Sequence, residues 1–229
     1  MKIGIIFAMK EELNALKKRL EIVNEFKIYD LIFYEAKYKK ITCVLVESGI
    51  GKVNAARCTQ VLIDNIKVDY IFNIGVAGGI EGNLNVGDIV VGTSLVQHDF
   101  DITAFNHDKG YIPNLGVFTT SDEHLIRLTK AIDKTLKYGV IASGDIFCTD
   151  YNMSNKIHNK FNALCVEMEG ASIAQVSYLC NIPFLIIRSI SDIPNNNNTI
   201  TYDEFLEISS NKVADIMIKL MNKLTEEAR

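Results

Sequence analysis

Carboxylic acids and one arginine stand in this sequence where acid and base chemistry could be carried out. Asp192 ends the apolar run FLIIRSISD, in which Arg188 is also unusual, because charged side chains are rarely buried unless they are paired. Glu12 follows an apolar run near the start of the chain, and Glu167 and Glu169 follow another. Two carboxyl groups on opposite sides of a ligand could donate a proton to one atom and remove a proton from another.

Each of these features also has a purely structural interpretation. Glu12 could be a first-turn glutamate that the helix dipole favours, and one of Glu167 and Glu169 could assist the start of a helix. The run at residues 75–79, GVAGG, has neither GxGxxG spacing nor a P-loop lysine, so it predicts only a tight turn that lets backbone approach a ligand. The histidines lack metal-ligand spacing and Cys148 has no neighbouring base, which argues against metal or thiol catalysis.

The elements that must position these residues follow from hydrophobic patterning. Apolar runs with strand character lie at residues 2–8, 41–47, 69–74, 88–96, 139–143, 163–167 and 183–190. Helical spacing of apolar residues occurs between them, at 13–20, 55–62, 125–132, 173–179 and 205–224. The alternation predicts an α/β sandwich around a mixed or parallel sheet, with a hairpin within residues 26–47.

Composition limits the class of protein and its partners. A chain of 229 residues with 48% hydrophobic content predicts one domain over residues 1–229. The net charge of −4, without a dense basic block, argues against nucleic acid and favours a small-molecule partner. Five cysteines without a CxxC pair indicate a reducing compartment. The start MKIGIIFAMKEE is too short for a signal peptide or membrane span, which predicts a cytoplasmic protein without membrane contact.

The chemically unusual residues collect after predicted strands. Ligands of α/β sheets bind beyond the carboxyl ends of the strands, so we expect these residues to share one pocket. The asparagine tract at residues 195–198 comes directly after Asp192 and is too short for a domain boundary, so it predicts a flexible loop.

Eight short stretches, in order, resemble the 5'-methylthioadenosine/S-adenosylhomocysteine nucleosidases of the nucleoside phosphorylase superfamily. They are GIIFAMKEE at 4–12, ESGIGKVNAA at 47–56, NIGVAGG at 73–79, VGDIVV at 86–91, HDFDITAF at 98–105, SGDIF at 143–147, VEMEGASIA at 166–174 and RSISD at 188–192. The resemblance covers nearly the whole chain. It implies a three-layer α/β/α sandwich around a mixed sheet, and a homodimer.

The resemblance also implies a reaction and its catalytic residues. The family hydrolyses the bond between adenine and a 5'-thio-substituted ribose, without a cofactor, and so serves methionine salvage and removal of a methyl-cycle product. Asp192 matches the general acid that protonates the purine at N7, and its apolar surroundings are expected to raise its pKa. Glu12 matches the residue that binds and deprotonates the attacking water, and Arg188 is expected close to that water.

The remaining family matches concern substrate binding. Glu169 matches the acceptor for the ribose hydroxyls, Met168 packs under the sugar, and Phe147 stacks on adenine, whose edge the backbone of Phe147 and Cys148 reads. The apolar 5'-thio pocket corresponds to Met9, Ile50, Phe105, Pro113 and Tyr202, with Phe105 and Pro113 supplied by the partner subunit. Further residues expected to line the substrate site are Val76, Ala77, Gly78, Glu167 and Ser191.

Three positions depart from the family pattern. Val76 stands where a serine hydroxyl commonly helps to hold the water. Pro194 lacks the backbone N–H that could stabilise ionised Asp192, which favours the protonated acid. Tyr202 adds a hydroxyl at the mouth of the apolar pocket, so the preference between methylthioadenosine and adenosylhomocysteine stays open.

Two other functions compete with hydrolysis. A phosphorylase of the same fold needs donors for phosphate, and related phosphorylases place an arginine and a serine where this chain has Asn73 and Val76. A carboxylate at Glu12 would also repel phosphate. A nucleoside-binding protein without catalysis is the other alternative, although binding alone needs no acid and base on opposite faces of the sugar.

Overall fold

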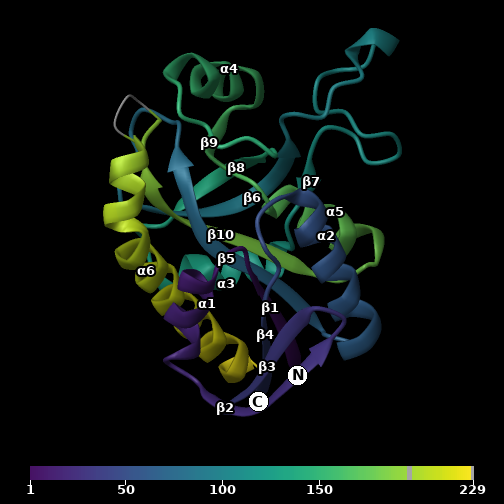
Figure 1. Ribbon diagram of the computed structural model, residues 1–229, viewed down its shortest axis with the longest axis vertical. Helices are drawn as coiled ribbons and strands as arrows, with labels where there is room; N and C mark the ends of the chain where they lie inside the picture. The colour runs from purple at the N-terminus through teal and green to yellow at the C-terminus, as the bar shows by residue number, and fades with distance from the viewer. Residues whose placement is uncertain (195–197, 228–229) are drawn as a thin grey trace.

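The computed structural model describes residues 1–194 and 198–227. The first three residues of the predicted asparagine loop, 195–197, therefore lie outside the described residues, and the fourth, Asn198, begins a helix. Within the described part, helices cover both faces of one mixed sheet (Figure 1). The predicted fold class, an α/β/α sandwich around a mixed sheet, is confirmed.

One half of the sheet is open and the other half closes on itself. The strand order is β10 (Phe184–Asp192), β6 (Ile89–Gln97), β8 (Lys137–Ser143), β9 (Ala163–Glu167), β5 (Tyr70–Gly79), β1 (Lys2–Phe7), β4 (Ile41–Glu47), β3 (Leu31–Tyr38) and β2 (Glu21–Ile28), and the short β7 (Thr119–Thr120) pairs with β6. An additional parallel pairing joins β10 to β5. Because of it, β5, β10, β6, β8 and β9 form a closed ring, and the meander of β4, β3 and β2 extends the sheet on the far side of β1.

Two groups of helices form the outer layers. Figure 1 shows α1 and α6 on one side of the strands and α2 and α5 on the other. The alternation of side chains along β1 separates the two cores: Ile3, Ile5 and Phe7 pack with α1, α3 and α6, whereas Ile6 packs with α2 and α5. The helices are α1 (Lys10–Lys17), α2 (Lys52–Val61), α3 (Glu123–Ile132), α4 (Tyr151–Phe161), α5 (Gly170–Leu179) and α6 (Asn198–Glu227), with a π-helical turn at Leu62–Ile66 and a 3-10 turn at Thr103–Phe105.

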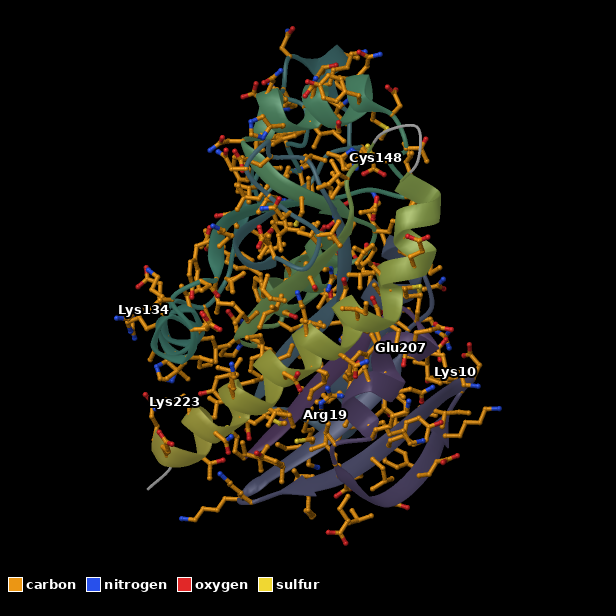
Figure 2. The ribbon with its side chains drawn as sticks, turned by 90° about the vertical axis from the view of Figure 1, so that its left-hand side faces the viewer. Lys10, Arg19, Lys134, Cys148, Glu207 and Lys223 are labelled. Atoms are coloured by element: carbon orange, nitrogen blue, oxygen red, sulfur yellow. The ribbon has the colours of Figure 1, made fainter. Side chains whose placement is uncertain are left out.

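The long helix α6 crosses one whole face of the molecule (Figure 2). Its first turns lie at the end of the molecule that carries Cys148, and Arg19 lies beside its middle. Arg19 donates to the side chains of Asn211 (3.0 Å) and Asp215 (2.9 Å). These contacts tie α6 to the region after α1, so the start of α6 is held over the end of the sheet where β10 stops.

The structure differs from the sequence predictions at three places. The helix α4 was not predicted, although Asp150 begins it by accepting a hydrogen bond from the backbone N–H of Asn152 (2.7 Å). The meander begins at Glu21, earlier than the predicted hairpin. The tight turn predicted for the glycine run at 75–79 is wrong. These residues continue β5 as regular strand, and no glycine of this described segment has a positive φ.

The glycines of β5 provide room for neighbouring carboxylates instead of a turn. A Cβ on Gly75 would lie 2.4 Å from Oε1 of Glu12, and a Cβ on Gly78 would lie 3.3 Å from Oδ2 of Asp192. Register pairs Gly75 with Arg188 and Gly78 with Asp192 on β10, with a bulge between Ile190 and Asp192. Because the glycines of β5 have no side chains, charged groups of other elements can approach its backbone.

Gly75→Ala is expected to destabilise the protein by about 1 to 3 kcal/mol, because the added methyl group overlaps the buried Glu12 carboxylate. Urea unfolding measures the change. Gly82→Ala is the matched control, because a Cβ there meets nothing within 4 Å, and it should change the free energy of unfolding by less than about 1 kcal/mol. Equal stability of the two variants would contradict the close approach of Glu12 to β5.

Candidate active site

A cavity of about 600 Å³, including its open mouth, lies at the ends of β1, β5, β9 and β10. Of the predicted site residues, all except Arg188, Phe105 and Pro113 line it. They are joined by three residues that were not predicted, each a direct neighbour of a predicted one. The lining is Ala8, Met9, Glu12, Ile50, Val76, Ala77, Gly78, Ile146, Phe147, Cys148, Val166, Glu167, Met168, Glu169, Ser191, Asp192 and Tyr202.

Glu12 is buried in the wall of the cavity. Its Oε2 accepts hydrogen bonds from the backbone N–H groups of Ala8 (3.0 Å) and Met9 (3.1 Å), and its Oε1 accepts one from Val76 (2.9 Å). Burial raises the pKa of Glu12, although Arg188 and these N–H groups oppose the rise. Both sequence-based interpretations of Glu12 therefore apply: its carboxylate caps the start of α1, and it also lines the cavity.

Arg188 lies behind the cavity wall with 2% of its side chain exposed. Its guanidinium donates to Glu167 and to the side chain of Asn73. The distance from the same nitrogen to Glu169 is 4.0 Å. Burial alone would lower the pKa of Arg188, but the surrounding glutamates Glu167, Glu169 and Glu12 raise it, so the guanidinium stays charged.

Glu167 is engaged almost entirely by the protein itself. Besides Arg188, its carboxylate accepts from the hydroxyl of Ser143 and from the backbone N–H groups of Glu169 (3.2 Å) and Gly170 (2.7 Å). Gly170 is the first residue of α5. Glu167 is thus the glutamate of the pair that supports the helix start, and it anchors Arg188 as well.

Glu169 is the more available carboxylate of the pair. Its Oε1 accepts from the backbone N–H of Gly51 (2.8 Å). Burial and the nearby charge of Glu167 raise the pKa of Glu169 to about 8, against the opposing effect of Arg188. Hydrogen bonds donated by the hydroxyl groups of a ligand would occupy the acceptor sites of this carboxylate and stabilise its ionised form.

Asp192 ends β10 at the opposite part of the cavity, with 1% of its surface exposed. The hydroxyl of Ser191 donates to its Oδ1 (2.8 Å) and lies 3.4 Å from the carbonyl oxygen of Ala77. Because Glu12 abuts Gly75 and Asp192 abuts Gly78, roughly 10 Å of strand separates the two carboxyl groups. A ligand in the cavity is placed between them.

Aromatic and sulfur-containing side chains form the mouth of the cavity. The rings of Phe147 and Tyr202 meet edge to face, 5.6 Å apart, and the Tyr202 hydroxyl lies 3.1 Å from Sδ of Met9. Phe147 and Ile50 are 43% and 52% exposed, so a ligand entering here would cover apolar surface. Burial raises the pKa of the Cys148 thiol, which keeps it neutral.

Phe105 and Pro113 lie away from the cavity. They belong to the segment between β6 and β7, drawn in teal at the upper right of Figure 1, which extends beyond the rest of the chain. Phe105 is 76% exposed, and every residue from 103 to 109 is exposed. Within one chain the structure therefore does not bring them to the site.

Neither a metal-ligand cluster nor a membrane-spanning helix is found among the described residues. Among residues 1–194 and 198–227, no three histidine, cysteine, aspartate or glutamate side chains are grouped as metal ligands. None of the described helices combines the length and the apolarity that crossing a bilayer requires.

Comparison with known sequences gives one consistent family. The model of the phosphorylase superfamily matches residues 2–222. A 5'-methylthioadenosine/S-adenosylhomocysteine nucleosidase of Bacillus licheniformis is 40% identical over 230 residues, covering 98% of this chain and 100% of the relative. The nucleosidase of Bacillus subtilis is 36% identical, covering 98% of this chain and 100% of its own.

Solved structures give the same result. The Helicobacter pylori nucleosidase, in complex with a pyrrolidine compound that carries a propynylthio group, has a TM-score of 0.95 and 34% identity, and the match covers 97% of this chain and 98% of that one. The Streptococcus pyogenes adenosylhomocysteine nucleosidase, bound to 5-methylthiotubericidin, also has a TM-score of 0.95 at 34% identity, with 98% and 97% covered. A futalosine hydrolase of Helicobacter pylori is 33% identical with a TM-score of 0.95, and 97% of this chain and 98% of that one are covered.

Glu167→Gln is expected to lower the free energy of unfolding by about 3 to 5 kcal/mol, because it leaves a buried guanidinium without its closest counter-charge. Urea unfolding followed by circular dichroism measures this. Glu35→Gln is the control, since Glu35 pairs with Lys37 at 3.7 Å on the surface, and it should cost less than about 1 kcal/mol. A small loss for Glu167→Gln would mean that Arg188 does not depend on this carboxylate.

Proposed function

The chain belongs to the phosphorylase superfamily, and we propose that it hydrolyses the N-glycosidic bond of 5'-methylthioadenosine and S-adenosylhomocysteine, releasing adenine and the 5-thioribose product. One observation carries the proposal: two buried carboxyl groups, Glu12 and Asp192, face one cavity from different sides. The activity is that of an N-glycosyl hydrolase and serves methionine salvage.

The two carboxyl groups divide the proton transfers. Asp192 donates a proton to N7 of the purine, so adenine leaves C1' as a neutral base while positive charge develops on the ribose. Glu12 accepts a proton from the water whose oxygen forms the new bond to C1'. A pKa raised by burial suits Glu12 to this role, because a more basic carboxylate accepts the proton more readily.

The sugar and the base have separate partners. Glu169 accepts hydrogen bonds from the ribose 2' and 3' hydroxyls, with Met168 below the ring, and Phe147 stacks on adenine beside Cys148. Arg188 does not line the cavity, so we assign it to positioning: it holds Glu167 and adds positive charge behind Glu12 and Glu169. The sequence-based expectation that Arg188 lies close to the attacking water stays a prediction.

The charges of the lining favour water over phosphate. The described residues that line the cavity include four carboxyl groups, those of Glu12, Glu167, Glu169 and Asp192, and no lysine, arginine or histidine. A phosphate dianion would meet repulsion without cationic donors. Water as the nucleophile has neither problem, which is why hydrolysis is preferred over phosphorolysis.

The mouth of the cavity is where the 5' substituent would bind and where a partner subunit would contribute residues. Met9, Ile50 and Tyr202 form an apolar site for the 5'-thio group. We propose that Phe105 and Pro113, in the exposed segment between β6 and β7, complete this site in the other subunit of a homodimer. We propose that residues 1–229 form one domain. The protein is proposed to act in the cytoplasm and to bind neither nucleic acid nor a membrane.

The direct test is adenine release in phosphate-free buffer from methylthioadenosine, adenosylhomocysteine, adenosine and inosine. A buried methylthio group should contribute about 1 to 3 kcal/mol of transition-state binding, so methylthioadenosine should exceed adenosine by roughly 10- to 200-fold in kcat/KM. Added phosphate should not change the rate. Phosphate dependence would indicate a phosphorylase, and adenosine as the best substrate would contradict the apolar 5' site.

Asp192→Asn should lower kcat by about 10² to 10⁴, because the amide keeps the shape of the side chain but cannot transfer a proton to N7. Binding of methylthioadenosine should weaken much less than turnover. Steady-state kinetics and calorimetric titration separate the two effects. Retention of more than about a tenth of the kcat would identify Asp192 as a structural aspartate and remove it from the mechanism.

A further inference from the structure

A cluster of polar side chains outside the assigned site lies directly behind the cavity wall. Lys52, the first residue of α2, donates from Nζ to Oδ1 of Asp99 (2.6 Å) and to Oε1 of Gln97 (3.1 Å). The side chains of Lys52 and Asp99 are only 17% and 18% exposed. An ion pair shielded to this degree is screened less by salt than a surface pair and holds its geometry better.

The cluster closes into a loop of hydrogen bonds through Asp145. The second oxygen of Asp99, Oδ2, accepts from the backbone N–H of Asp145 (2.9 Å). The carboxylate of Asp145 in turn accepts from the backbone N–H of Lys52 (2.8 Å). Three segments that are distant in sequence are thereby joined: the turn before α2, the residues after β6 and the segment after β8.

Two of these segments carry walls of the cavity. The turn before α2 contains Ile50 and Gly51, and the backbone N–H of Gly51 donates to Glu169. The segment after β8 contains Phe147 and Cys148. A Cβ on Gly51, whose φ is +98°, would lie 3.1 Å from the Asp145 carboxylate, so a glycine is needed for the two segments to meet this closely.

We propose that Lys52 and Asp99 are positioning residues for nucleoside binding, which clamp the adenine-stacking segment at Phe147 to the turn that orients Glu169. The inference deepens the proposed function and rests on it. Glu12 and Asp192 are held by β1, β5 and β10, outside the clamp. Loss of the clamp should therefore weaken binding of the base and sugar more than it slows the chemical step.

The test compares Lys52→Met, Asp99→Asn and the double variant. An asparagine at position 99 has one acceptor oxygen, so it must lose either the Lys52 bond or the Asp145 bond. Each single variant should raise KM for methylthioadenosine and the calorimetric Kd of adenine by about tenfold, with kcat within about threefold of wild type. The double variant should be no worse than the worse single variant, since each single variant already opens the same loop of hydrogen bonds.

Two further variants make the comparison specific. Lys52→Arg keeps the charge and should stay within about threefold of wild-type KM. Asp30→Asn removes the exposed pair of Asp30 with Arg57 and should leave all constants unchanged. If Lys52→Met does not fold, Asp99→Asn carries the same comparison.

Unchanged KM and adenine Kd in Asp99→Asn, with only a lower melting temperature, would overturn the inference and leave the cluster with a structural role. Multiplicative effects in the double variant would also overturn it. Failure of the wild-type protein to release adenine would instead contradict the proposed function, and the wild-type Kd of adenine would then show whether the cavity binds the base at all.

Discussion

The buried guanidinium of Arg188 is the interaction on which the rest of the site depends. A charge with 2% exposure is tolerated only with close counter-charges, and Arg188 finds them in Glu167 on β9, with Asn73 on β5 as a further acceptor. These three residues belong to three different strands of the closed ring. Closure of the ring brings these three side chains together. Any other register of β10 would separate them and leave a buried charge unpaired, which is unfavourable. The same register sets Asp192 beside Gly78.

Backbone N–H groups stabilise, by hydrogen bonding, the carboxyl groups whose negative charge Arg188 alone cannot balance. Glu12 receives three of them, Glu169 receives one from Gly51, and Glu167 receives two at the start of α5. These donors are fixed in direction and carry no net charge. The cavity can therefore hold several carboxylates without lining it with cations. Such a site accepts donors such as water and sugar hydroxyls, and it disfavours anions.

Sequence patterns predicted the parts that depend on local order. Apolar runs identified most of the strands, and the carboxylates were expected where they are found, at the strand ends. What could not be predicted depends on pairing between distant segments. The role of the glycines in β5 requires knowledge that Glu12 lies against Gly75, and the clamp of Lys52 and Asp99 joins segments 47 residues apart. Two glutamates with one residue between them look equivalent by spacing, so spacing could not show that Glu167 is the anchor; only the family resemblance assigned a separate role to Glu169. Val76 departs from the family pattern in its side chain, whereas its contact with Glu12 is made by its backbone.

Counting occupied acceptor sites separates the roles of the glutamates. An ionised carboxylate offers about four lone-pair sites. Among the described residues, Glu167 has four donors, Glu12 has three, and Glu169 has one hydrogen-bonded donor, with Arg188 4.0 Å away. Glu167 therefore has the least acceptor capacity left of the three and mainly supports its neighbours. Glu12 can accept one more donor, which matches a single water molecule. Glu169 keeps the largest acceptor capacity, which its proposed binding of two adjacent hydroxyl groups requires. The three side chains are chemically identical, and the donors that the fold supplies to each are the basis on which we propose that Glu167 supports the structure, Glu12 activates water and Glu169 binds the sugar.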